Sequence, residues 1–254
     1  FYTRHRRDFP WRRTTDPYHI LVSEIMLQQT QVGRVTEKFQ EFIDTFPTPT
    51  ALAEAPLARV LAAWQGLGYN RRAGNLHRLA ASVVAEHGGN IPDDPDLLAR
   101  LPGIGRATAA SICAFAFNRP VAFIETNIRA VFIHFFFPGR ERVDDGEIQP
   151  LVEAVLDRSD PRGWYSALMD YGTMLKKSHP NPSRRSARHR RQPPFEGSRR
   201  QLRGEVIRVV LGNPGVTIGR LVTMTERPEP EVRDAVEGLI GEGLAYRKGR
   251  GIFV

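Results

Sequence analysis

Cysteine is the scarcest kind of residue in this sequence, and Cys113 is the only one among 254 residues. A single thiol cannot close an internal disulfide, and it cannot build a cluster site that needs several thiolates. The neighbours of Cys113 in the segment ASICAFAF place it on an apolar helix face. We therefore expect this side chain to be packed in the core, where free cysteines usually lie.

Long apolar runs are missing as well. The longest, VFIHFFFP at residues 131–138, contains a histidine and is far too short to cross a bilayer. No segment resembles a secretory signal. We expect a cytoplasmic protein that has no membrane partner.

Acidic residues are almost absent from one stretch of the chain. Between Lys176 and Arg203 there are ten lysine and arginine residues, four prolines and a single acid, Glu196. This stretch lacks apolar periodicity, so residues 178–198 are predicted to be a linker or an extended basic arm. The chain has a formal charge of +8 and an isoelectric point near 10.1, which favours an anionic partner such as a nucleic acid.

Different patterns of secondary structure lie on the two sides of this arm. Upstream, helical periodicity dominates, and one helical pattern runs through Ile20, Leu21, Glu24, Ile25, Gln28 and Val32. Downstream, residues 199–254 predict three helices and a small hairpin that turns at residues 248–251, which resembles a winged helix. The expected fold is an all-α core at residues 1–177 with a C-terminal winged-helix-like α+β domain.

The segment LPGIGRATAASI contains a turn whose backbone is open to a ligand. Pro102 ends the preceding helix, Gly103 and Gly105 permit positive φ and close approach, and a helix begins near Arg106. The free N–H groups and positive dipole end of such a helix bind phosphate without reading a base. The alternative is a plain corner between two helices, in which the glycines serve only the bend.

Four motifs in order resemble one known family. LPGIG is followed about twenty residues later by FIETNIRAV, and SEIMLQQTQV and WQGLGYNRRAGNLH precede them. This pattern resembles the helix-hairpin-helix (HhH-GPD) DNA glycosylase superfamily, and within it the MutY-type adenine glycosylases, over about residues 9–177. The resemblance implies a six-helix lobe at about 15–125, a second lobe formed by both flanks, and a monomer that flips a base out of duplex DNA.

The resemblance also assigns the catalytic residues. A purine leaves its sugar when a ring nitrogen is protonated, and the sugar left behind has oxocarbenium character that a negative charge stabilises. Glu24 is the expected proton donor, because an acid on an apolar helix face has a raised pKa; the alternative is an exposed helix glutamate. Glu125 replaces the aspartate of the family as the charge partner, and Asn127 is expected to orient it or the flipped nucleotide.

Ala107 stands where bifunctional relatives carry a lysine that forms a Schiff base with the sugar. Alanine has no amine, so the resemblance implies a monofunctional glycosylase that leaves an abasic site. In the family, the residues that correspond to Gln28 and Gln29 enter the duplex, and the residue that corresponds to Tyr69 wedges the base stack open. The residues expected to contact DNA are Gln28, Gln29, Thr30, Tyr69, Arg71, Gly103, Gly105, Arg106 and Thr108, with Arg72, Arg184 and Arg185 as further phosphate contacts.

The chain also departs from this family. Relatives usually hold an iron–sulfur cluster on four cysteines after the segment corresponding to MDYGTMLKK, and this chain has none there, so we expect no cluster. His179 and His189 alone make a poor metal site, and no metal is expected. We also expect no C-terminal domain resembling nucleotide-pool hydrolases, since residues 200–254 are too few for one.

The sequence thus predicts a base-excision enzyme acting on mispaired duplex DNA of the nucleoid, with adenine opposite guanine or 8-oxoguanine as substrate. Two alternatives remain. A thymine or uracil glycosylase for G:T and G:U mismatches shares the core, and a DNA-binding protein on the same fold could have lost catalysis.

Overall fold

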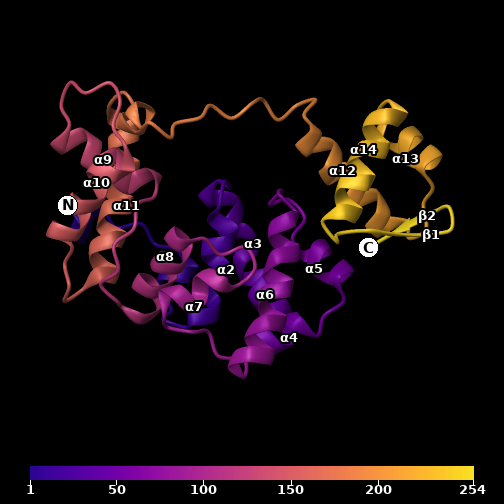
Figure 1. Cartoon of the computed structure of the whole chain (residues 1–254), viewed down its shortest axis with the longest axis horizontal. Helices are drawn as coiled ribbons and strands as arrows, with labels where there is room; N and C mark the ends of the chain where they lie inside the picture. Colours follow the sequence, from indigo (N-terminus) through magenta and orange to yellow (C-terminus); the bar gives the residue numbers. More distant parts are fainter. The chain divides into compact units, whose positions relative to one another are not determined.

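The computed structural model describes residues 1–254 and is almost wholly helical, with fourteen α-helices, two short 3-10 helices and one two-stranded sheet (Figure 1). This confirms a helical core followed by a small α+β domain. The chain forms two compact units. The first unit comprises Phe1–Glu24, Pro92–Arg100 and Ile104–Arg191, and the second comprises Ile25–Ile91, Leu101–Gly103 and Gln192–Val254.

Helices α9, α10 and α11 pack side by side in the first unit and enclose its core (Figure 1). Phe132 and Tyr165 are the largest side chains buried there, and the Tyr165 hydroxyl donates to the carbonyl of Val121 at 3.0 Å. The elements of this unit are α1 (Tyr2–His5), η1 (Pro10–Arg12), most of α2 (Pro17–Leu27), α7 (Pro95–Arg100), α8 (Arg106–Phe117), α9 (Thr126–Phe136), α10 (Asp145–Val155), α11 (Pro161–Ser178) and η2 (Pro182–Arg185).

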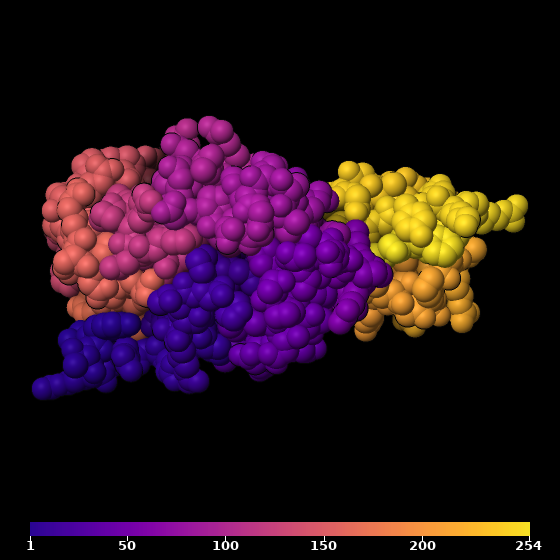
Figure 2. Space-filling model, turned by 90° about the horizontal axis from the view of Figure 1, so that it is seen from below, coloured from indigo at the N-terminus to yellow at the C-terminus, as the bar shows by residue number.

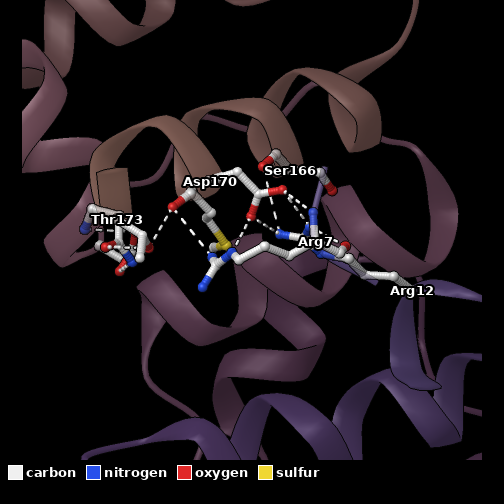
Figure 3. A network of polar contacts seen from close by, with 8 residues as sticks. Arg7, Arg12, Ser166, Asp170 and Thr173 are labelled. Atoms are coloured by element: carbon white, nitrogen blue, oxygen red, sulfur yellow. Dashed lines mark hydrogen bonds and ion pairs between the residues drawn. The ribbon is translucent and has the colours of Figure 1, made fainter. Parts of the chain in front are cut away.

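A buried carboxylate fastens the N-terminal segment to α11. The Asp170 side chain is 1% exposed and accepts hydrogen bonds from Arg7 Nε at 2.7 Å and from Arg12 Nη1 at 2.8 Å (Figure 3). Burial alone would raise the pKa of Asp170, but the hydrogen bonds from both arginines outweigh it and hold that pKa below its usual range. The N-terminal residues thus form part of the first unit through one charged centre.

The second unit has an aromatic core made by Trp64, Phe42 and Phe46, all of them buried. Its C-terminal part is the expected winged helix, with β1 and β2 antiparallel and a turn at Gly249 and Arg250; Figure 2 shows this part as one continuous body, orange to yellow. The elements of this unit are α3 (Val32–Thr45), α4 (Pro49–Ala53), α5 (Leu57–Ala63), α6 (Arg71–His87), α12 (Arg199–Gly212), α13 (Ile218–Thr225), α14 (Glu229–Gly241), β1 (Tyr246–Lys248) and β2 (Gly251–Phe253).

The helical pattern predicted to continue through Val32 is wrong. Helix α2 ends at Leu27, and α3 begins at Val32 after a loop in which Gln29 has a φ of 55°. The spacing of apolar residues continues across this break, so the sequence did not reveal it. The carbonyl groups at the end of α2 accept hydrogen bonds from Arg72, which is distant in the sequence.

The first half of the predicted arm packs on the first unit. Ser186 forms a parallel bridge with Val143, and the Val143 N–H donates to the carbonyl of Arg185 at 2.9 Å. Ser183 and Ser186 are buried. Residues 188–197, in contrast, are exposed throughout and contain no helix or strand.

Candidate active site

Glu24 lies in the interior of helix α2, where α8 approaches it. The Ser111 hydroxyl of α8 donates to Glu24 Oε2 at 2.5 Å. Burial raises the pKa of Glu24 to about 7, the Ser111 hydrogen bond opposes that shift, and the negative charge of Glu125 adds to it. The raised pKa expected from the apolar helix face is confirmed, and a carboxyl group with this pKa can hold or release a proton near neutral pH.

Glu125 is the N-cap of helix α9. Its Oε1 accepts from the backbone N–H groups of Asn127 at 2.7 Å and Ile128 at 3.1 Å, and its Oε2 accepts from Asn127 Nδ2 at 3.2 Å. The helix dipole favours a negative charge at this position. The structure thus brings Glu24, Glu125 and Asn127 together in the first unit, with Asn127 orienting the Glu125 carboxylate as expected.

Two residues that the motifs did not single out support this centre from α11. Thr173 Oγ1 lies 3.2 Å from Asn127 Oδ1 and donates to the carbonyl of Met169 at 2.8 Å. A Cβ at Gly172 would lie 2.3 Å from the carbonyl oxygen of Asn127. A glycine inside a long helix was the available signal for this close approach. Ser111, a small residue on an apolar helix, gave no signal.

Gly172→Ala is expected to push α9 and α11 apart, because the added methyl group would overlap backbone. Overpacking of this kind costs about 1 to 3 kcal/mol of unfolding free energy. The matched control is Gly204→Ala on α12, where the new Cβ meets no atom within 4 Å and a helix gains about 0.5 to 1 kcal/mol. Urea unfolding of both variants measures the difference, and equal stability would contradict it.

The turn between α7 and α8 leaves one helix end open. Gly103 has a φ of 81°, whereas Gly105 is extended at −93°, so the expectation of positive φ is correct for Gly103 alone. Gly105, Arg106 and Ala107 are exposed, and a Cβ at Gly105 would meet no atom within 4 Å. Thr108, the next residue, is half-buried. The first N–H groups of α8 can therefore be reached by an anion.

Two loops of the second unit hold strained residues. Gln29, in the loop after α2, has a φ of 55°, and Tyr69, in the loop before α6, has a φ of 49°. A residue other than glycine in the left-handed region costs about 1 to 3 kcal/mol, and such residues cluster at functional sites. Both residues had been expected to contact DNA. The Tyr69 hydroxyl also bonds to Arg200 Nη1 at 2.6 Å and to Gln192.

The two arginines at the start of α6 differ in environment. Arg71 is exposed, as a phosphate contact should be. Arg72 instead donates from both terminal nitrogens to carbonyl oxygens of the two strained loops and of the end of α2, so the expectation that it holds phosphate is wrong: these two nitrogens already bond inside the protein. Burial lowers the pKa of Arg72 to about 10, which leaves it charged at neutral pH.

The arm arginines also differ. Arg184 is exposed. Arg185 donates to the carbonyl oxygens of Ile133, Phe137 and Arg140, where helix α9 ends. These carbonyl groups have no partner within the helix and attract a cation. Arg185 therefore serves as a helix cap, contrary to its expected role as a phosphate contact.

The residues present do not fit an iron–sulfur cluster. No group of three or more histidine, cysteine or acidic residues is placed to hold a metal ion. Cys113 is buried, as predicted, and its thiol donates to the carbonyl of Asp93 at 3.4 Å. Burial raises the pKa of this thiol to about 11, which disfavours the thiolate that a metal needs. His179 packs edge to face against His134. No helix is long and apolar enough to span a bilayer.

A two-glycine turn before an open helix end, together with two carboxylates in the first unit, is typical of the helix-hairpin-helix class of fold. Residues 22–153 match the family described as HhH-GPD superfamily base excision DNA repair protein. The chain belongs to this superfamily.

Relatives extend this assignment. An adenine DNA glycosylase of Mycolicibacterium smegmatis is 32% identical over the whole chain and 92% of its own length. One of Mycobacterium tuberculosis is 44% identical over 132 residues, which are 52% of this chain and 43% of the relative. The chain thus matches less than half of that relative. A solved thermostable thymine-DNA glycosylase has a TM-score of 0.62 at 29% identity and covers 66% of this chain and 79% of its own.

Proposed function

We propose that this chain is a monofunctional DNA glycosylase of base excision repair that removes adenine mispaired with guanine or 8-oxoguanine. The observation that carries the proposal is the half-buried Glu24, which bonds to Ser111 and lies in the field of Glu125, and whose raised pKa of about 7 suits proton donation. The relatives of this chain that are named adenine DNA glycosylases support adenine as the base that is removed. We propose that the protein acts as a monomer on duplex DNA, in the cytoplasm at the nucleoid.

The chemistry divides between the two carboxyl groups. Protonated Glu24 gives its proton to a ring nitrogen of the flipped purine, so the base leaves as a neutral molecule. Glu125, held in place by Asn127 and its helix end, stabilises the positive charge that develops on the sugar. Water then adds to the sugar carbon and gives up a proton to the Glu24 carboxylate, which restores the acid and leaves an abasic site.

Ala107 decides what happens to the strand. It is exposed at the start of α8 and has no amine, so it cannot form a Schiff base with the opened sugar. We propose that the strand stays intact after the base has been removed. The open end of α8, with Gly103, Gly105 and Arg106, holds a phosphate of the same strand.

The second candidate is a glycosylase for thymine or uracil mispaired with guanine. The similarity to a solved thymine-DNA glycosylase favours it. A pyrimidine also needs less acid assistance than adenine, so Glu24 would matter less. The third candidate, a DNA-binding protein without catalysis, predicts binding with no product.

One assay separates the three candidates. Duplexes carrying A:G, A:8-oxoguanine, G:T and G:U are incubated with the purified protein, and half of each sample is treated with alkali to cleave abasic sites. We expect product from the adenine duplexes after alkali alone. Product from G:T or G:U only would establish the second candidate, no product the third, and nicks without alkali would contradict the role given to Ala107.

We propose that residues 1–177 form the catalytic core, that residues 178–198 form a basic arm and that residues 199–254 form a winged-helix-like domain. The arm neutralises DNA phosphates with three exposed arginines that form no ion pair, Arg184, Arg190 and Arg191; Arg188 is also exposed, but it pairs with Asp145 at 3.5 Å. Since the chain has a single cysteine, we propose that this arm neutralises phosphates in place of the loop that holds an iron–sulfur cluster in relatives. Purified protein should be colourless and free of stoichiometric iron; a brown protein with stoichiometric iron would refute this.

Replacing the three unpaired exposed arginines of the arm, Arg184, Arg190 and Arg191, with glutamine is expected to flatten the salt dependence of DNA binding. Each phosphate contact contributes about 0.9 to the slope of log K against log salt, so the slope should fall by up to about 3. The control is Arg185→Gln, which should lower stability and leave the slope nearly unchanged, because Arg185 caps α9. Equal slopes for the triple variant and the wild type would exclude the arm from binding.

A further inference from the structure

Arg72 connects two loops that are far apart in the sequence. Its Nη1 donates to the carbonyl oxygens of Ile25 at 2.8 Å, Met26 at 2.8 Å and Gln28 at 2.6 Å. Its Nη2 donates to Thr30 Oγ1 at 2.8 Å and to the carbonyl oxygens of Leu67 and Gly68, both at 3.1 Å. One guanidinium therefore reaches six acceptors.

The contacts on one side of Arg72 end a helix. Ile25 and Met26 lie in the last turn of α2, where carbonyl groups have no partner within the helix. A cation at this position satisfies them and is favoured by the helix dipole. Gln28 and Thr30 follow directly in the loop and bond to the same side chain. The left-handed Gln29 lies between these two tethered neighbours.

The contacts on the other side hold the loop that carries Tyr69. Leu67 and Gly68 immediately precede Tyr69, and Trp64 Nε1 donates to the Gly68 carbonyl at 3.1 Å. The Arg72 guanidinium also lies over the rings of Trp64 at 5.4 Å and Tyr69 at 5.5 Å. The left-handed Tyr69 is thus fixed through its two preceding residues and through its own ring.

None of the ion pairs in the structure includes Arg72, and its Nε is buried without a hydrogen-bond partner. A partly buried cation that bonds only to carbonyl and hydroxyl oxygens is an expensive arrangement. The planar fork of arginine can serve both loops at once, whereas a lysine ammonium has three donors around a single point. This difference makes arginine specific at this position.

We propose that Arg72 is a positioning residue for base extrusion, which sets the Gln29 and Tyr69 loops in the register needed to enter the duplex together. This inference rests on the proposed function, because it assumes that both loops meet DNA. Without the fork, each loop can leave its strained conformation independently. The duplex would still be bound through phosphates, but the mispaired base would leave the stack less often.

The test compares Arg72→Lys with Arg162→Lys. Arg162 is also partly buried with an unpartnered Nε, but it donates to the Ala116 carbonyl in the first unit, away from both loops in the sequence. Excision is measured in single turnover with enzyme in excess over an A:8-oxoguanine duplex. Base extrusion is followed by fluorescence of 2-aminopurine placed beside the mispaired adenine.

We expect Arg72→Lys to lower the single-turnover rate constant about ten- to a hundredfold, the usual effect of small misplacement. The 2-aminopurine signal should fall with it, while affinity for matched duplex stays within about twofold of wild type because phosphate contacts remain. Arg162→Lys should match wild type in all three measurements.

Poor folding and lost positioning give different results. A folding defect reduces the amplitude of the single-turnover reaction and leaves its rate constant unchanged, and that result would overturn the inference. A wild-type rate constant and fluorescence in Arg72→Lys would overturn it too. If wild type excises no base from any duplex, the proposed function fails instead, and the fluorescence comparison still tests Arg72.

Discussion

Glu24→Gln is expected to lower the single-turnover excision rate about 10² to 10⁴-fold, because the glutamine amide cannot donate the proton that the leaving base needs. Affinity for duplex DNA should hardly change, since phosphate contacts supply most of it. Glu37→Gln is the control, an exposed glutamate on α3. Turnover of the Glu24 variant at the wild-type rate would remove Glu24 from the mechanism.

The same assay has a defined pH dependence. Glu24 must be protonated to act, and its pKa is about 7, so the wild-type rate should fall as pH rises through about 7. The residual rate of Glu24→Gln should lack this decline. A wild-type rate that stays constant from pH 6 to pH 8.5 would show that another group supplies the proton.

The folding stability of the wild type should decline over the same pH range. Because the folded-state pKa of Glu24 is raised, folding stability is fully present below the unfolded pKa of 4.5 and declines as pH rises toward about 7. Glutamine does not ionise, so Glu24→Gln should be more stable than wild type above pH 7, by on the order of 3 kcal/mol. Urea unfolding at pH 5 and pH 8 measures this gain, and we expect the gain to be larger at pH 8.

Asp170→Asn is expected to destabilise the protein by about 3 kcal/mol at pH 7, because it leaves two arginines facing a neutral amide at a buried position. The N-terminal segment should detach from α11. Chemical unfolding gives the free energy, and hydrogen exchange of residues 1–12 shows where the loss occurs.

The loss of stability in Asp170→Asn should depend on pH as expected for a carboxyl group whose pKa is lowered in the folded state. Stability from Asp170 is present above its unfolded pKa and is lost as pH falls through the lower, folded pKa. The gap between wild type and Asp170→Asn should therefore close in acid. Asp8→Asn removes an exposed pair with Arg13 in the same segment and should change little. A similar loss in both variants would mean that burial of Asp170 is unimportant.

Several features followed from local sequence alone. The start of α8 at Arg106, the hairpin turn near Gly249 and the core position of Cys113 were predicted correctly. Glycines, prolines and apolar spacing act over a few residues, so a local pattern is enough to specify them. The absence of an amine at position 107 likewise follows from the identity of Ala107 alone and does not depend on the tertiary structure.

The tertiary structure alone decided which distant groups meet. Ser111 is 87 residues from Glu24, and Arg72 is 47 residues from Ile25, yet both pairs are joined by hydrogen bonds. Arg185 was indistinguishable in sequence from Arg184, and only the position of the α9 carbonyl groups made it a cap. The residue type fixes how many hydrogen-bond donors a side chain has. Which acceptors those donors reach depends on packing between segments that the local pattern does not encode.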